Sequence, residues 1–488
     1  MRRIVILILL ISTFKLFGQD VTNLKTFTKN ELQNDFDIVV NALKEAHPGL
    51  YWYTTFAQFD RLCNDQKSKI VDNLNALDFY RILAPVIVAT KEGHCKISLS
   101  KEIEDHFNKN GKYLPIFIKF FEGKPYVIND IDGLKINGSI LSKINGRPID
   151  EIIATIFNTI SSDGNNITKK YQTISGQDFS YYYSDVINQS TTYELELINP
   201  KTNKISLFTV ASVAGSWLEK QWAKIDETYF YKSKIPSSLT FLNNNKSAVL
   251  AYNTFRADKY SDFHKTTDGY FNEISKNNVT DLIIDLRNNS GGEEGFEDYV
   301  FSYLTDQPYN KYKYVQSTAF SYSFYAFTNR NTIEKQNSLE KALQNEQALE
   351  SDGRILRKPN MLVPEKPKRS SFKGKLFVLT SGKTYSGGSE FASLVKGHRK
   401  ATFIGEECGG GFYGNTSGFN IDLTLPNSKL SIKIPLLKFV VDVNDKNIPF
   451  GSGVLPDYAV KPIYIDFVNG IDTELELAKK LISKNINH

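Results

Sequence analysis

The sequence predicts a multidomain α/β fold with a helical N-terminal region, a β-rich module and an α/β core. Three observations predict it. Residues 28–92 carry apolar side chains at helical spacing, and residues 113–210 contain short strand-like segments separated by turns. From Ser247 onward, apolar segments of strand length alternate with longer helical segments, which is typical of a largely parallel sheet. A length of 488 residues accommodates several such units.

The N-terminus has the composition of a secretory signal peptide. Two arginines precede the apolar segment Ile4–Ile11, which Ser12–Phe17 extends, and Gly18 is followed by polar residues. A membrane anchor is the alternative, but the segment is shorter than the roughly 20 residues that a spanning helix needs. We therefore expect residues 1–18 to be cleaved on export, leaving a periplasmic or extracellular protein without stable membrane insertion.

Helix signals define the N-terminal region, which we delimit at residues 19–100. Thr28 is a suitable N-cap, and apolar residues at 32–43 follow with helical period. Two further periodic stretches cover residues 56–70 and 76–88. The region is therefore expected to be a small helical domain or cap.

Strand and turn signals define a second unit at residues 101–212. The dipeptide Asn145-Gly146 is a strong turn signal between a strand and a helix start, and residues 193–210 have the pattern of a hairpin. We assign residues 213–245 to a linker.

The remaining chain, residues 246–488, is predicted to be the α/β core. Residues 305–370 interrupt it with a polar, charge-mixed stretch that lacks clear periodicity, and we interpret them as an inserted excursion or lid. The expected strands are 248–252, 282–286, 375–380 and 401–404, and the expected helices are 259–277, 294–304 and 389–396.

Composition excludes some classes of function. The net charge is +5 without a long basic run, so nucleic acid is not an expected partner. No His/Cys/Asp cluster has ligand spacing, so we expect neither a metal nor another cofactor. The three cysteines are Cys63, Cys95 and Cys408. Cys95 and Cys408 flank two of the motifs below; either they form a bridge or both are free thiols.

Three segments carry candidate chemistry. Asp285–Gly292 runs from a buried strand into a turn with two glycines, where backbone N–H groups can face a ligand; a simple tight turn is the alternative. In Leu379–Phe391, Ser386 lies between a strand and a helix, where helix N–H groups favour an oxyanion; helix capping is the alternative. His94, in the turn Lys91–Cys95, is a candidate general base or a structural histidine.

Taken in order, these segments resemble tail-specific and C-terminal-processing serine proteases. The resemblance covers nearly the whole mature chain and includes an upstream acidic-Gly-His segment. Its motifs are Leu286-Arg287-Asn288-Asn289-x-Gly291-Gly292, then Thr380-Ser381-x-x-Thr384-x-Ser386-x-x-x-Glu390, then Gly405-Glu406 with Gly409-Gly410-Gly411, then Gly453-Val454-x-Pro456-Asp457.

The resemblance implies a crotonase-like catalytic core, a PDZ-like module at 101–212 and an acyl-enzyme mechanism. It implies that Ser386 is the nucleophile and that Gly387, with Gly291 or Gly292, forms the oxyanion hole. The function it implies is an exported serine-type endopeptidase that cleaves unstructured or C-terminal segments of proteins. A non-catalytic peptide or small-ligand binding protein on the same scaffold and an esterase are the alternatives.

One departure concerns the general base. Well-known members use a lysine in the glycine-rich loop, where this chain has Gly411, and no lysine lies between Lys400 and Lys429. The tricorn-like branch uses a histidine, which His94 matches. By the same analogy the acidic partner of His94 is expected shortly before Gly453, where Asp445 is favoured over Asp442.

Overall fold

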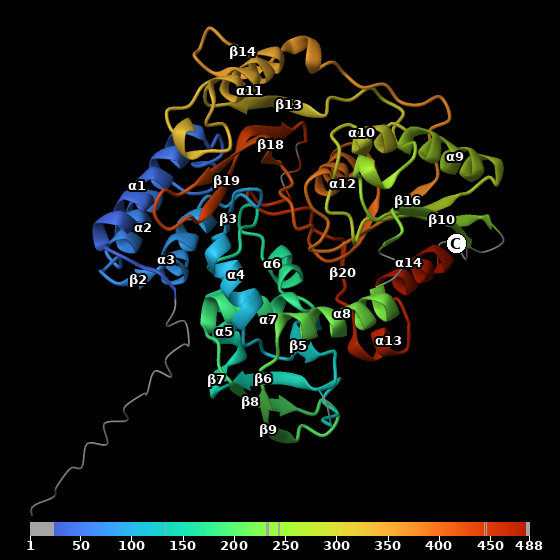
Figure 1. Cartoon of the computed structure of the whole chain (residues 1–488). Coiled ribbons are helices and arrows are strands. Elements are labelled where there is room, and N and C mark those ends of the chain that lie inside the picture. The colour runs from blue at the N-terminus through green and yellow to red at the C-terminus, as the bar shows by residue number, and fades with distance from the viewer. Residues whose placement is uncertain are drawn as a thin grey trace, which may run out of the picture.

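The computed structural model describes residues 24–131, 133–230, 234–242, 245–443, 445 and 447–484. The predicted signal peptide, residues 1–18, lies outside the described residues. The described chain forms a helical N-terminal part, a module below it and an α/β core beside both, with a second sheet above (Figure 1). Within these described ranges, no helix is long and apolar enough to cross a membrane.

The helices predicted near the N-terminus are confirmed. Each begins with a reciprocal capping box, in which Thr28, Thr55 and Asn75 accept hydrogen bonds from the third helical residue. A two-stranded antiparallel sheet joins the segment before the first helix to the segment before the third. The elements are β1 (Thr26–Phe27), α1 (Lys29–Ala46), α2 (Phe56–Lys67), β2 (Leu74–Asn75) and α3 (Ala76–Val88).

The second unit contains an antiparallel sheet of order β4-β5-β6-β8-β9, with β7 beside β6. The predicted turn is confirmed, because Asn145 and Gly146 both adopt positive φ, 50° and 76°. The unit also contains helices that the sequence pattern did not predict. The elements are α4 (Lys101–Asn110), β4 (Ile118–Phe121), β5 (Lys124–Val127), β6 (Ile140–Ile144), β7 (Arg147–Pro148), α5 (Ile149–Phe157), α6 (Thr168–Thr173), α7 (Asp178–Tyr182), the π-helix η1 (Tyr183–Ile187), β8 (Thr192–Ile198) and β9 (Ile205–Ala211).

The stretch 213–245 is not a plain linker, and that expectation is wrong. It contains helix α8 (Gly215–Phe230) and strand β10 (Ser237–Leu242), and β10 pairs antiparallel with the first core strand. Because β10 lies at an edge of the sheet and is only partly buried, its apolar pattern is weak in the sequence.

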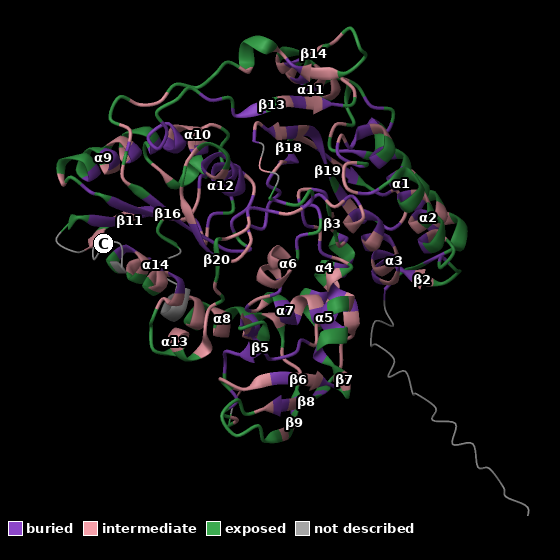
Figure 2. Cartoon of the chain, turned by 180° about the vertical axis from the view of Figure 1, so that it is seen from behind, coloured by how far each residue is buried: buried purple, intermediate pink, exposed green. Residues whose placement is uncertain are grey.

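The core confirms the predicted alternation of strands and helices. Its sheet has the order β10-β11-β12-β16-β17-β20 and is parallel from β11 to β20. Strands β11 and β16 lie buried between helical layers (Figure 2). The elements are β11 (Ser247–Tyr252), the 3-10 helix η4 (Ala257–Lys259), α9 (Phe263–Lys276), β12 (Asp281–Asp285), α10 (Phe296–Phe301), β16 (Lys375–Thr380), α12 (Gly387–His398), β17 (Thr402–Gly405), β20 (Tyr458–Ala459), α13 (Tyr464–Val468) and α14 (Thr473–Lys484).

Successive residues of the core strands face different layers. In β12, Leu282 and Ile284 belong to the main hydrophobic core, whereas Ile283 packs with Ala478 and Ile482 of α14. Arg287, just after β12, is ion-paired with Asp285, Asp472 and Glu474. The C-terminal helix is therefore fixed to the sheet edge at which β12 ends.

Residues 305–370 contain strands and helices that their sequence pattern did not predict. Strand β13 (Tyr312–Ser317) pairs with β19 (Ser431–Val441) in a second, antiparallel sheet of order β14-β15-β13-β19-β18. Strand β3 (Lys96–Ser98) also pairs with β19. The other elements are β18 (Gly414–Thr424), β14 (Gln347–Leu349), β15 (Ile355–Arg357), α11 (Ile333–Glu346) and the 3-10 helices η5 (Tyr325–Phe327) and η6 (Pro359–Met361).

Candidate active site

Two loops at the carboxyl ends of β12 and β16 form the base of the site. Thr384 Oγ1 donates to the Leu286 carbonyl at 2.9 Å, and the Tyr385 N–H donates to the Asn289 carbonyl at 2.9 Å. Parallel strands bring these loops to the same sheet edge, where α/β folds bind ligands. The two glycine-containing motifs predicted from the sequence therefore meet.

Ser386 lies at the junction of the β16 loop and α12, with φ 52° and ψ −128°. A non-glycine residue in this region is strained, which is common where a nucleophile is presented on a sharp turn. The Ser386 side chain makes no capping hydrogen bond to α12. Instead its Oγ lies 3.1 Å from His94 Nε2. The helix-capping alternative is thus excluded.

His94 reaches the serine from the turn between α3 and β3. The pairing of β3 with β19 fixes the chain just after it, and the buried carboxylate of Glu92 accepts from Thr416 N and Oγ1 at 3.0 and 3.1 Å. Burial, followed by the nearby charge of Lys169, lowers the pKa of His94 to about 3. The imidazole is therefore neutral at pH 7 and available to accept a proton.

The other ring nitrogen of His94 faces Tyr385. Tyr385 Oη lies 2.8 Å from His94 Nδ1 and donates to Asp163 Oδ1 at 3.3 Å. Asp163 is buried and also accepts from Gly93 N at 2.7 Å and Gly411 N at 3.1 Å. Serine, histidine, tyrosine and aspartate thus form one continuous series of contacts.

The structure does not bring either predicted acidic partner to His94. The ring nitrogens of His94 contact Ser386 and Tyr385, and the ring also interacts with the backbone of Thr416. The Asp445 side chain accepts from Asn447 N at 2.9 Å, within its own turn. The backbone carbonyl of Asp442 accepts a hydrogen bond from His398 Nε2, away from His94. Asp163 stands in a polar turn, and no local motif marks it in the sequence.

Two of the three predicted oxyanion-hole glycines have a free N–H group. Gly291 N donates to Asn289 Oδ1 at 2.8 Å, whereas the N–H groups of Gly292 and Gly387 donate to no acceptor in the described ranges. Gly291 has φ +93°, and a Cβ there would lie 2.7 Å from both Gly387 N and Ser386 Cβ. Only glycine permits this close approach of the two loops.

The glycine-rich loop contributes backbone rather than a lysine. Gly411, at the position where the resemblance implies a lysine, donates its N–H to Asp163. A lysine does approach the site from α6, which sequence reasoning missed: Lys169 Nζ lies 3.5 Å from the centroid of the Tyr385 ring. Burial lowers the pKa of Lys169 to about 8.

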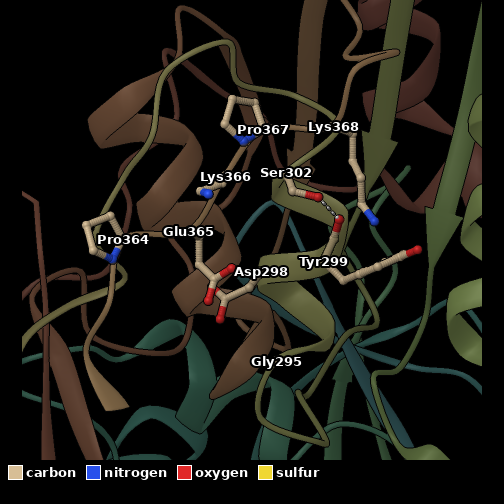
Figure 3. A pocket seen from close by; sticks show the side chains of 9 residues that line it. All are labelled: Gly295, Asp298, Tyr299, Ser302, Pro364, Glu365, Lys366, Pro367 and Lys368. Atoms are coloured by element: carbon tan, nitrogen blue, oxygen red, sulfur yellow. Dashed lines mark hydrogen bonds between the residues drawn. The ribbon is translucent and has the colours of Figure 1, made fainter. Parts of the chain in front are cut away.

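In the part of the chain that the structure describes, neither a disulfide nor a cluster of metal ligands accompanies the site. Cys63, Cys95 and Cys408 are all buried free thiols, so the bridge considered for the last two is not formed. No group of three or more candidate metal ligands occurs among the residues that the structure describes. A cavity of about 500 Å³ between α10 and residues 364–368 is lined by residues of both signs of charge, and neither Ser386 nor His94 lines it (Figure 3).

A strained serine in contact with a neutral histidine, beside two free backbone N–H groups, defines a serine-type hydrolase. Residues 246–460 match the model of peptidase family S41. This part of the chain is therefore a peptidase family S41 domain, and its enzymatic class is that of the serine-type peptidases.

Two solved structures of mature CPAF share the fold over nearly the whole chain. Mature CPAF is 15% identical, with 94% of this chain and 98% of that chain covered and a TM-score of 0.62. Mature CPAF complexed with lactacystin is 16% identical, with 94% and 99% covered and a TM-score of 0.62. The photosystem II D1 C-terminal processing protease is 13% identical, with 88% and 93% covered and a TM-score of 0.41.

Proposed function

We propose that the protein is an exported serine endopeptidase in which Ser386 attacks the peptide carbonyl and His94 acts as the general base. The observation that carries this proposal is the 3.1 Å contact between Ser386 Oγ and His94 Nε2 at a strained backbone position. The peptidase family S41 match of residues 246–460 supports a peptide as substrate.

The geometry supports a complete acyl-transfer cycle. Ser386 Oγ forms a bond to the carbonyl carbon while its proton passes to His94 Nε2, and the carbonyl π electrons move onto oxygen. The N–H groups of Gly387 and Gly292 stabilise that oxyanion. The oxyanion then re-forms the carbonyl as the C–N bond breaks, and His94 gives its proton to the leaving amine. A water molecule attacks the acyl-enzyme and passes its proton to His94, which returns it to Ser386 Oγ as the ester bond breaks and the carboxylic acid leaves.

The substrate is proposed to be an unstructured or C-terminal protein segment. Residues 101–212 form an antiparallel sheet with helices, which supports a PDZ-like assignment, and residues 19–100 form the helical cap. The edge strand β9 can add an extended peptide through backbone hydrogen bonds. Export rests on the signal-like residues 1–18, and cleavage there is tested by N-terminal sequencing of the secreted protein.

Fluorophosphonate labelling of the mature protein tests the chemistry. We expect one adduct on Ser386, no adduct in Ser386→Ala, and labelling slowed at least about 100-fold in His94→Ala, since general bases contribute 10²–10⁴-fold. The exposed Ser370→Ala is the matched control and should label as the wild type does.

Substrate profiling then separates the remaining alternatives. Cleavage of unfolded proteins or peptides by the wild type, and not by Ser386→Ala, supports the endopeptidase assignment. Hydrolysis of esters without peptide cleavage contradicts it. A native protein that neither labels nor cleaves would instead be a binding protein on this scaffold.

A further inference from the structure

The side of His94 that faces away from the serine is enclosed by groups from the module and the core. Tyr385 Oη is 2.8 Å from Nδ1, and the Tyr385 ring lies 4.8 Å from the imidazole, centroid to centroid. In a Ser–His–Asp triad a carboxylate holds this nitrogen directly. Here a tyrosine hydroxyl occupies that place, and the carboxylate of Asp163 lies behind it.

The direction of the tyrosine proton acts on the tautomer of the histidine, together with the Thr416 backbone that also interacts with the ring. Burial raises the pKa of Tyr385 well above its usual value, so the hydroxyl keeps its proton. If that proton points to Asp163, the tyrosine oxygen offers lone pairs to Nδ1, which must then carry the imidazole proton. In that tautomer Nε2 is unprotonated and can accept the proton of Ser386.

The surroundings of Asp163 favour this arrangement. Its two carboxyl oxygens accept from Gly93 N and Gly411 N, and Tyr385 Oη is a third donor. Burial raises the pKa of Asp163, whereas the nearby Lys169 ammonium and these three donors act against the rise. An ionised carboxylate can only accept a hydrogen bond, whereas Nδ1 of a neutral imidazole can either accept or donate one. The tyrosine proton is therefore directed to Asp163, and Nδ1 takes the donor role.

We propose that Tyr385 and Asp163 act together as positioning residues, with Tyr385 accepting the Nδ1 proton of His94 and donating its own to Asp163. The proposal rests on the proposed function of Ser386 and His94. During attack, one proton moves from Ser386 Oγ to His94 Nε2, and the imidazolium retains its Nδ1 proton on Tyr385 Oη. No other proton is transferred. The Asp163 charge, one hydroxyl away, stabilises the imidazolium.

The two variants to test are Tyr385→Phe and Asp163→Asn in the full mature chain. Tyr193→Phe is the matched control, because this buried tyrosine donates to the Lys112 carbonyl in the module and lies outside the site. The kinetic parameters kcat and KM for cleavage of a peptide are measured, together with the rate of fluorophosphonate labelling. Histidine ring ¹⁵N spectra report the tautomer directly, and the signal of His94 is assigned by its loss in His94→Gln.

In the wild type the His94 spectrum should show the Nδ1–H tautomer. Tyr385→Phe should give a mixture of tautomers, with kcat lowered about 100-fold and KM changed less than about threefold, as for loss of base function. Asp163→Asn should shift the tautomer in the same direction with a smaller loss. The control should match the wild type in both readouts.

Retention of the Nδ1–H tautomer in Tyr385→Phe, with kcat within about threefold of the wild type, would overturn the proposal. The spectrum is an equilibrium property, so it tests the positioning role even if no substrate is cleaved. Failure of the wild type to label on Ser386 would instead contradict the proposed function. If Tyr385→Phe does not fold, Asp163→Asn carries the test by the same spectrum.

Discussion

Replacing Gly93 by alanine should impair turnover without unfolding the protein. Gly93 precedes the histidine, and an added Cβ would lie 2.5 Å from Tyr385 Oη, 2.3 Å from Lys169 Nζ and 3.1 Å from Asp163 Oδ1. The lysine end can turn aside. The tyrosine is fixed by its neighbours, and reaching an ordinary contact of 3.4 Å requires its oxygen to move by 0.9 Å, the difference from 2.5 Å.

The expected loss follows from the cost of this crowding. Overpacking a well-filled site costs about 1–3 kcal/mol. If that strain falls on the tyrosine–histidine contact of 2.8 Å, kcat/KM drops about 5- to 150-fold, since 1.36 kcal/mol corresponds to a factor of ten. The assay is peptide cleavage by Gly93→Ala, with thermal unfolding measured in parallel.

Gly269→Ala is the matched control. Gly269 lies within α9, and a Cβ there meets no heavy atom within 4 Å. We expect unchanged kcat/KM and a gain in stability of about 1 kcal/mol from helix propensity. The reasoning is refuted if Gly93→Ala keeps kcat/KM within twofold of the wild type. The site would then accommodate the added methyl group without displacing Tyr385, contrary to the short Cβ distances.

Further predictions concern stability and cofactors. Arg287→Met should lower the free energy of unfolding by about 3–5 kcal/mol in urea, because it leaves the Asp285 and Glu474 carboxylates of a buried cluster unpaired; a loss under 1 kcal/mol would contradict this. His47 and His94 are buried with pKa values of about 3, below the 6.5 of the unfolded chain. The unfolded state therefore binds more protons between these values, so stability should fall as pH drops from about 6.5 to 3, by at most about 5 kcal/mol per histidine. Urea titrations at several pH values check the slope, which His47→Gln should reduce. Dialysis against a chelator should leave peptide cleavage unchanged, and a loss restored by a metal ion would show a site that the described residues do not reveal.

The sequence predicted the strands and the site residues that short local patterns mark. The strands at β12 and β16 are continuous apolar segments because both faces of the sheet are covered, so their position is evident without the structure. Ser386 and His94 are flanked by glycines in short motifs, and the structure brings them together. Gly387 and Gly292 follow from the same motifs.

The rest depends on contacts that spacing does not encode. Tyr385 is adjacent to the serine in the sequence, but its role follows from the direction of its ring. Asp163 lies in a polar turn of a different unit, and Lys169 is on α6, a short helix whose residues are all partly buried. Such a helix forms through its tertiary contacts, so no periodic pattern marks it. Strand β10 was missed for the related reason that an edge strand buries little.

The contacts of the site come from three parts of the chain: His94 from the N-terminal part, Asp163 from the middle unit and Ser386 from the core. Under the proposed mechanism, a nascent or truncated chain that lacks any one of them has an incomplete site, so full hydrolytic activity is expected only when the last part has folded against the first two. The middle unit is for the same reason not freely exchangeable. Replacing this unit with another module would remove the Asp163 carboxylate that accepts a hydrogen bond from Tyr385.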